Sequence, residues 1–317
     1  MIPEEIYQKI VRYAVKAPSG HNTQPWQFAR NEDGFFIKPD FSRALPLADP
    51  LHRELFISLG CLAETAMIAA QYYGYQPSVQ IPDSADTIKI SLQKDETTVP
   101  PDLYPYINIR QTTRNLFSGK TIPTKDLSVL QDVAGNGNIR LFTGQNEIQQ
   151  FSPYISMANA LQMGNPAFKK ELIQWMRFSE KEAMQKGDGL YTACSGVPSM
   201  GRMMGSLVLK SFVNAASENK RYLKQLENSA AVVLFTSSGD RAEDWINTGM
   251  IFQRFVLTAT RLGLNYSFLN LPCQVAAIRE KMISGLSLDS EFPQLIIRLG
   301  YSAKMPYSFR RQASLRP

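Results

Sequence analysis

Two apolar stretches that share one pattern constrain the fold of this chain more than any other feature. The span from Gly60 to Gly74 has the same length as the span from Gly249 to Gly263, and each continues a long, mostly apolar helical pattern. Apolar residues at equivalent places in the two spans form the pairs Leu62 and Ile251, Ala66 and Phe255, Met67 and Val256, Ile68 and Leu257, Ala70 and Ala259, and Tyr73 and Leu262. A strand-like segment follows each span. The repeat predicts two degenerate copies of one α+β unit.

The rest of the chain predicts helices and strands in mixed order. Helices are expected at residues 3–17, 50–73, 124–134, 145–162, 166–180 and 243–262, and strands at residues 26–30, 35–38, 88–92, 138–142, 231–236 and 295–299. Residues 94–105 are charged and rich in proline, which predicts a crossover linker, and Gly135-Asn136-Gly137 predicts a turn. Residues 185–206 contain glycines and methionines, and we expect them to form a mobile loop or lid.

Composition limits the class of protein and its partners. Hydrophobic residues make up 44% and charged residues 20% of the chain, which is typical of soluble globular proteins. The net charge of +6 is spread along the sequence, so we expect no nucleic-acid-binding arm, and the longest apolar stretch, residues 249–264, is too polar to span a bilayer. Three distant cysteines and two histidines predict neither a metal site nor a disulfide framework. We therefore expect a cytoplasmic protein that acts on a small-molecule substrate, with no membrane partner.

The segment Pro18–Trp26 gathers small, hydrogen-bonding and aromatic residues into one turn between a predicted helix and a predicted strand. Ser19, Asn22 and Gln24 can donate to or accept from a ligand edge rich in carbonyls and ring nitrogens, and Gly20 lets a backbone approach closely. These residues suit a polar planar ligand. The alternative interpretation is the entrance to a hairpin, with Trp26 as an anchor in the core.

A second polar segment, Arg110–Arg114, lies far along the chain. Its two arginines are four residues apart, which would place them on one helical face. Guanidinium groups match the geometry of phosphate oxygens and often bind them through two hydrogen bonds. By itself the pattern also fits a solvated surface pair.

Together the two segments resemble the motifs of a known family. Pro18–Trp26 resembles the Pro-Ser-x-x-Asn-x-Gln-Pro-Trp signature of the FMN-dependent nitroreductases, and Arg110–Arg114 resembles their Arg-x-Ser-x-Arg motif, with Thr112 in place of serine. Leu299-Gly300-Tyr301 and the later pair Arg310-Arg311 resemble the family's C-terminal phosphate-binding end. Ordinary members have the arginine motif first, whereas here it comes second. That order resembles the fused, pseudo-dimeric (Acg-like) branch of the family.

The resemblance implies a nitroreductase-like α+β fold with two degenerate nitroreductase-type halves in one chain. It implies a central, mostly antiparallel sheet flanked by helices, with a lid near residues 185–206. Residues 1–95 would form the first half and residues 96–317 the second half, packed as one compact unit. A monomeric pseudo-dimer follows, because the twofold interface would be internal, with a homodimer as the alternative.

The resemblance also assigns residues to an FMN site. Arg110, Thr112 and Arg114 would bind the phosphate and the pyrimidine edge of the ring, joined by the backbone of Gln111. From the other half, four residues would border the isoalloxazine: Pro18, Ser19, Gly20 and Asn22. Arg310 and Arg311 would meet the phosphate. No catalytic side chain and no metal is implied, since the flavin carries the chemistry.

The activity implied is transfer of hydride from NADH or NADPH through flavin N5 to a nitroaromatic, a quinone or a similar electron-poor acceptor. The alternative is a protein that sequesters FMN under a lid that limits turnover. The stretch at residues 267–272 lacks the glutamate and glycine of the family's Pro-x-Glu-Gly loop, which bears on the contact to N5. A flavin-destroying enzyme of the cobalamin pathway and iodotyrosine deiodinase are relatives by fold, but neither implies this fused layout.

Overall fold

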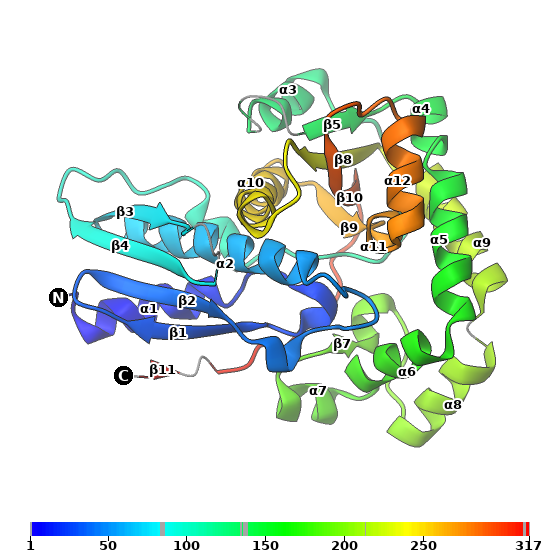
Figure 1. Cartoon of the computed structure of the whole chain (residues 1–317), viewed down its shortest axis with the longest axis horizontal. Helices are drawn as coiled ribbons and strands as arrows, with labels where there is room; N and C mark the ends of the chain where they lie inside the picture. The colour runs from blue at the N-terminus through cyan, green and yellow to red at the C-terminus, as the bar shows by residue number, and fades with distance from the viewer. Residues whose placement is uncertain are drawn as a thin grey trace. The chain divides into compact units, whose positions relative to one another are not determined.

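A computed structural model describes residues 2–82, 86–133, 135, 139–212, 214–312 and 315–316 (Figure 1). The chain divides into two compact units, and neither is continuous in sequence. Unit 1 comprises Met1–Arg110, Asp240–Arg261 and Arg310–Pro317, and unit 2 comprises Gln111–Gly239 and Leu262–Phe309. These units do not follow the expected boundary at residue 95, because unit 1 extends to Arg110 and takes in a helix and a C-terminal segment from the later part of the chain. The assignment of residues 1–95 and 96–317 as two nitroreductase-like halves stays a prediction.

Unit 1 is built on a five-stranded sheet with the order β11-β1-β2-β4-β3. Its strands are β1 (Trp26–Arg30), β2 (Gly34–Pro39), β3 (Tyr75–Gln80), β4 (Ile88–Lys94) and β11 (Leu315–Arg316). All neighbours pair antiparallel except β1 and β11, which are parallel. The sequence predicted the hairpin, β4 and a strand-like segment after Gly74, where β3 lies, but not β11. Pro77 weakens the strand signal of β3, and an edge position is where a strand tolerates proline.

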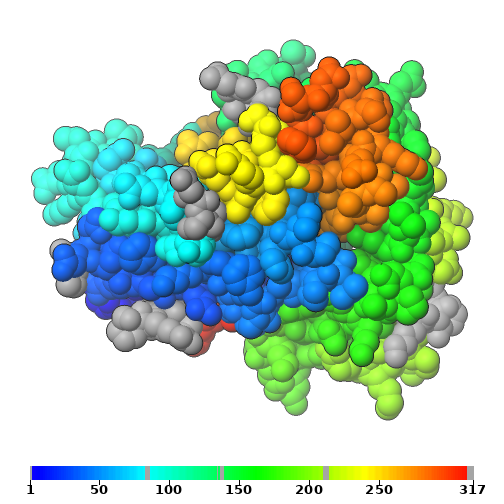
Figure 2. Space-filling view, viewed as in Figure 1, coloured from blue at the N-terminus to red at the C-terminus, as the bar shows by residue number. Residues whose placement is uncertain are grey.

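Three helices complete unit 1: α1 (Glu4–Ala14), α2 (Arg53–Tyr72) and α10 (Ala242–Arg261). The 20-residue helix α2 is long and apolar enough to cross a bilayer by length and composition, but 83% of that apolar window is buried inside the structure. It packs against α1, α10 and strands of its own sheet. The segment that leads into α10 lies at the surface in Figure 2 (yellow), where the Arg241 side chain is 82% exposed. Most apolar residues of α2 and α10 are buried and form part of the core of unit 1.

The two long helices cross at the glycines that the sequence repeat singled out. A Cβ atom on Gly60 would lie 2.0 Å from the carbonyl oxygen of Ile246, and one on Gly249 would lie 2.0 Å from the carbonyl oxygen of Ile57. The shift along the sequence that aligns the apolar pairs also places Gly60 on Gly249 and Ile57 on Ile246. The two contacts are therefore equivalent. Only glycine allows the backbones to approach this closely, so the repeat marks a symmetric helix contact.

Unit 2 is built on a four-stranded antiparallel sheet with the order β5-β8-β10-β9. Its strands are β5 (Ile139–Phe142), β8 (Ala231–Ser237), β9 (Asn265–Phe268) and β10 (Phe292–Gly300), and a separate parallel pair consists of β6 (Met176–Arg177) and β7 (Leu190–Tyr191). The mostly antiparallel pairing agrees with the expected fold class. The single central sheet does not, because each unit has a sheet of its own.

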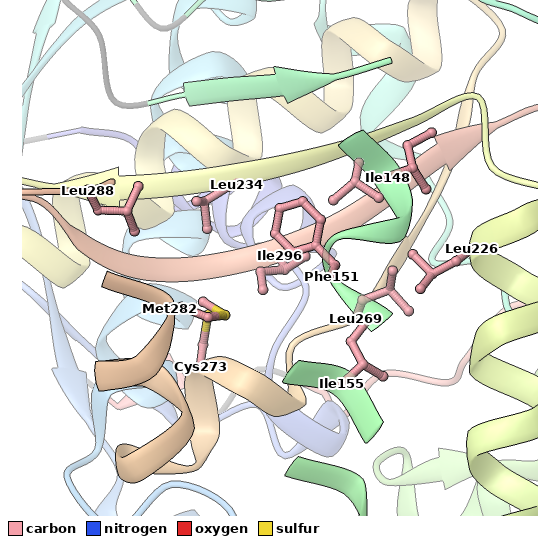
Figure 3. Close-up of a cluster of buried hydrophobic side chains, with 11 residues drawn as sticks. Ile148, Phe151, Ile155, Leu226, Leu234, Leu269, Cys273, Met282, Leu288 and Ile296 are labelled. Atoms are coloured by element: carbon pink, nitrogen blue, oxygen red, sulfur yellow. The ribbon is translucent and has the colours of Figure 1, made fainter. Parts of the chain in front are cut away.

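The helices of unit 2 are α3 (Thr124–Asp132), α4 (Gln145–Gln149), α5 (Ser152–Gly164), α6 (Pro166–Trp175), α7 (Glu180–Lys186), α8 (Arg202–Phe212), α9 (Ala215–Glu227), α11 (Leu271–Gln274) and α12 (Ala276–Gly285). Figure 3 shows side chains of these helices meeting β8 and β10 around Phe151 and Ile296. Each fully buried aliphatic or aromatic side chain contributes about 1.5–3 kcal/mol. The sheet is thereby held as a firm support for the segments at its ends.

The expected lid is partly built of regular structure. Residues 185–206 include the end of α7, β7, a 3-10 turn at Thr192–Ser195 and the start of α8. The buried pair Arg177–Asp188, with 2.6 Å between Nη2 and Oδ1, fastens this region beside the β6–β7 pair. The helix expected at residues 166–180 ends at Trp175, because the next two residues form β6. Residues 136–137 of the expected turn lie outside the described residues.

Candidate functional site

The loop at Pro18–Trp26 has an unusual backbone. His21, Asn22 and Gln24 have φ angles of 46°, 55° and 54°, in the left-handed region that non-glycine residues rarely occupy. The hydroxyl of Ser19 accepts a hydrogen bond of 2.9 Å from the backbone amide of Gln24 and closes the loop. Strained backbone of this kind persists only where its surroundings fix it, and it concentrates at binding sites.

Gln24, one of the polar residues expected at the ligand edge, fixes the loop from inside. Its side chain is buried, and its Oε1 accepts a 2.9 Å hydrogen bond from the backbone amide of Arg311. The Arg311 guanidinium in turn donates to the Gln24 carbonyl oxygen at 2.8 Å. From the other side, Arg43 Nε donates to the carbonyl oxygen of Thr23 at 2.5 Å. The Pro18–Trp26 loop and the C-terminal arginine pair therefore form one hydrogen-bonded assembly.

A group of cations meets at the C-terminal end of α1, next to this loop. Arg110 Nη2 donates to the carbonyl oxygen of Lys16 at 2.8 Å. Arg310 donates to the carbonyl oxygen of Val15 at 3.1 Å and to that of Lys16 at 3.4 Å. Burial, together with the charge of Arg310, lowers the pKa of Lys16. Arg110 and Arg310 thus join Lys16 at the end of α1, three residues before Ser19, and an anion placed among these three positive charges would be stabilised.

Lys16 is a residue that the sequence motifs missed. It lies two residues before Pro18, outside the matched signature, and an isolated lysine at a helix end carries no distinctive pattern. Lys16 becomes a candidate only because Arg110 and Arg310 both donate to its carbonyl oxygen in the structure. Carbonyl groups at a helix C-terminus carry partial negative charge, which explains why both guanidinium groups bind there.

The arginine motif continues into unit 2, and there it is not helical. Thr112 forms a parallel bridge with Tyr266, and its hydroxyl donates to the Tyr266 hydroxyl at 3.1 Å. The next amide, of Thr113, donates to the Tyr266 carbonyl oxygen at 2.8 Å. The expectation that Arg110 and Arg114 share a helical face is therefore wrong, because pairing with β9 holds the segment extended.

The Gln111 side chain has a structural role. Its amide pairs with the backbone of Met305, with Nε2 donating to the carbonyl oxygen at 2.5 Å and Oε1 accepting from the amide at 2.8 Å. Further along the same segment, Ser308 lies 3.6 Å from the sulfur of Cys194, and Phe309 contacts Tyr191 with 6.0 Å between ring centroids. Residues 305–309 therefore join the arginine motif to the expected lid within unit 2.

The loop at residues 267–272, which lacks the family's glutamate and glycine, is held in place by the side chain of Asn270. Asn270 is buried, and its Oδ1 accepts a 3.0 Å hydrogen bond from the backbone amide of Ile296. The short helix α11 begins at the next residue. This segment is thus fixed to β10.

The expected site residues fall into two groups. Unit 1 contains Pro18, Ser19, Gly20, Asn22, Arg110, Arg310 and Arg311, and unit 2 contains Gln111, Thr112 and Arg114. Within unit 1, residues far apart in sequence are joined by the hydrogen bonds described above. The assignment of all ten residues to one ligand remains a proposal.

Comparison with known proteins agrees with the motif resemblance. The model of the nitroreductase family matches residues 109–301. Two Mycobacterium tuberculosis proteins that share the name "putative NAD(P)H nitroreductase" match over nearly the full length. One is 24% identical, covering 98% of this chain and 90% of the relative, and the other, acg, is 22% identical, covering 96% and 92%. A solved FMN-dependent nitroreductase, NfnB from Mycobacterium smegmatis in complex with NADPH, is 11% identical with a TM-score of 0.41, covering 64% of this chain and 92% of that one.

Proposed function

Because its family model covers well over half of the sequence, this chain belongs to the nitroreductase family, and we propose that it is an FMN-dependent oxidoreductase. NADH or NADPH would donate the electrons, in keeping with the names of the full-length relatives. A nitroaromatic, a quinone or a similar electron-poor molecule would accept them. The observation that carries the proposal is the approach of Arg110 and Arg310 to the helix end beside Ser19.

The residues of unit 1 fit the polar groups of FMN. A phosphate monoester carries nearly two negative charges at neutral pH, and Lys16, Arg110 and Arg310 supply three positive charges. Guanidinium groups match the geometry of phosphate oxygens and often bind them through two hydrogen bonds. Gly20 leaves little room for a side chain, since a Cβ there would lie 3.2 Å from Leu45 and 3.3 Å from Glu54.

The residues of this chain would bind and orient, and FMN when bound would supply the hydride chemistry. Arg110 and Arg310 would fix the phosphate. Ser19 and Asn22 would meet the polar edge of the ring, on a loop already fixed by Gln24 and therefore needing little reordering on binding. Preorganised donors of this kind stabilise charge without a general acid or base.

The first experiment measures FMN affinity and reduction. The purified chain should bind FMN, show the flavin absorbance band, and lose that band on anaerobic addition of NADH or NADPH. Substitution Arg310→Gln should weaken FMN binding by roughly 10–100-fold, because a hydrogen bond to a charged group contributes about 1.5–3 kcal/mol. Arg241→Gln is the matched control, since this arginine of unit 1 is 82% exposed and distant from the loop in sequence. A folded chain that binds no FMN would overturn the proposal.

Storage of FMN with little turnover is the second candidate. It is favoured by the order of the expected lid, which is fastened by the Arg177–Asp188 pair and packed on Ser308 and Phe309. A fixed lid would keep nicotinamide from the flavin. Under this alternative, bound FMN stays oxidised in excess NADPH but is bleached by dithionite. Rapid bleaching by NADPH followed by reoxidation with a quinone supports the reductase.

A further inference from the structure

Unit 2 contains a buried positive charge that its neighbours leave incompletely satisfied. Arg298, on β10, has no exposed surface. Its Nη2 donates to the carbonyl oxygen of Asn115 at 2.6 Å, and its guanidinium lies over the Phe117 ring at 4.0 Å from the centroid. Its Nε and Nη1 have no hydrogen-bond partner among the residues that the structure describes. An unsatisfied buried guanidinium is costly and calls for a counter-charge.

The nearby charged side chains add positive rather than negative charge. Arg221, on α9, acts on both Arg298 and Arg114: with burial, it lowers the pKa of Arg298 to about 9 and also lowers the pKa of Arg114. Among the described residues, the carboxylate that faces this group is that of Glu218, which pairs with Arg221. Within the described ranges, no ion pair joins Arg114 or Arg298 to an acidic residue. Three guanidinium groups therefore share one carboxylate.

Packing, rather than ion pairing, holds the three arginines in place. The Arg221 guanidinium lies 4.9 Å from the centroid of the Tyr222 ring. Gln225 Nε2 donates to the carbonyl oxygen of Arg114 at 3.1 Å, which ties the arginine motif to α9. Phe117 is confined by Gly300, where a Cβ would lie only 2.7 Å from the ring. The cluster is therefore held together without the negative charge that would balance it.

We propose that Arg114, Arg221 and Arg298 form an oxyanion subsite in unit 2, which takes a phosphate or carboxylate group of the electron donor or acceptor. The statement that this phosphate or carboxylate belongs to an electron donor or acceptor rests on the proposed function. Guanidinium groups bind both kinds of oxyanion through paired hydrogen bonds. The motif resemblance would place Arg114 at FMN, but we assign the phosphate of FMN to Lys16, Arg110 and Arg310 of unit 1. The subsite of unit 2, which includes Arg114, then serves a second anion.

The direct test is titration of the FMN-loaded chain with inorganic phosphate, followed by calorimetry. FMN occupies the cations of unit 1, so phosphate reports on unit 2. Arg221→Gln should raise the phosphate Kd by about tenfold or more, because it removes a charged hydrogen-bond donor. The Arg221 side chain is 42% exposed, so this variant should fold, and Arg241→Gln is the exposed control. Arg298→Met, a second variant of similar length, should abolish binding. Equal phosphate affinity in the wild type and Arg221→Gln, or no binding at millimolar phosphate, overturns the subsite.

FMN affinity separates this inference from the proposed function. Arg221→Gln should leave the FMN Kd within about twofold of the wild type, since ordinary exposed surface substitutions change free energies by about 0.5 kcal/mol or less. Arg310→Gln should weaken FMN binding but not phosphate binding by the loaded chain. If the chain binds no FMN at all, titration of the Arg310→Gln chain with phosphate still tests the subsite by itself.

Steady-state kinetics then identify the source of the oxyanion. If the group is the 2′-phosphate of the donor, Arg221→Gln raises the KM for NADPH but not for NADH. If it is a carboxylate of the acceptor, the same variant raises the KM for 4-nitrobenzoate but not for nitrobenzene. Loss of phosphate binding with all four KM values unchanged would overturn the assignment to a substrate.

Discussion

The helix crossing in unit 1 predicts the effect of adding one methyl group. In the variant Gly60→Ala the new Cβ would lie 2.0 Å from the carbonyl oxygen of Ile246. An ordinary C···O contact is about 3.3 Å, so α2 and α10 would have to part by about 1.3 Å. Overpacking a core typically costs about 1–3 kcal/mol, and a separation of this size belongs at or above the upper end. Alanine returns about 1 kcal/mol through its better helix propensity. We therefore expect a net loss of about 2 kcal/mol.

Gly164→Ala is the matched control. Gly164 ends α5, and a Cβ there would meet nothing within 4 Å. With no clash to offset helix propensity, this substitution should leave stability unchanged or raise it by up to about 1 kcal/mol. The two variants make the same chemical change and differ only in what the added methyl group meets.

Thermal and urea denaturation followed by far-ultraviolet circular dichroism measure both effects. A loss of about 2 kcal/mol should lower the Tm of Gly60→Ala by roughly 3 °C, because the unfolding entropy is about 2.1 cal/mol/K per residue. The double variant Gly60→Ala and Gly249→Ala should cost less than the sum of the single variants, because one separation of the helices relieves both clashes. Wild-type stability in Gly60→Ala, or strict additivity in the double variant, would refute the reasoning.

Two further predictions concern buried charges. Burial raises the pKa of Glu64 above its ordinary 4.5, and Arg254 acts in the opposite direction. Folding is therefore favoured by Glu64 when its carboxyl is protonated. This contribution is full below pH 4.5 and is lost as the pH rises through the folded-state pKa of Glu64. Glu64→Gln should flatten that part of the stability–pH profile in urea titrations, and an unchanged profile would contradict the assignment. Asp188→Asn should destabilise unit 2 by about 3–5 kcal/mol, because it leaves Arg177 buried without its counter-charge. The double variant Arg177→Met and Asp188→Leu should recover most of that loss in the same denaturation assay, and equal losses in the two variants would argue against an electrostatic cause.

Local patterns predicted the elements of this fold well where a segment is long or regularly patterned. The stripe of α1, the alternation of β4 and the apolar spans of α2 and α10 all correspond to observed elements. The same reasoning failed at Arg110–Arg114, where spacing suggested a helix. There a bridge to Tyr266, more than 150 residues away in sequence, decides the backbone. Spacing within a short segment cannot report a partner that distant.

The candidate site shows the same division. The motif residues Ser19 and Arg110 could be named from sequence because the chemistry of their side chains is local. Lys16 and the cluster around Arg298 could not, because their roles come from charges and hydrogen bonds between segments that are distant along the chain. Gln24 could be named from the motif, but its hydrogen bonds to Arg311 could not. A lone lysine or strand arginine carries no pattern of its own.

The sequence by itself determined the family, the main helices and strands, and the repeat that pairs Gly60 with Gly249. Each of these follows from side-chain chemistry or periodicity within a short window. The tertiary structure alone decided that α10 and the C-terminal arginines belong to unit 1, that Arg110 and Arg310 share the end of α1, and that Arg298 is buried beside further positive charge. These facts depend on long-range packing and electrostatics, which act through distance in space rather than order along the chain.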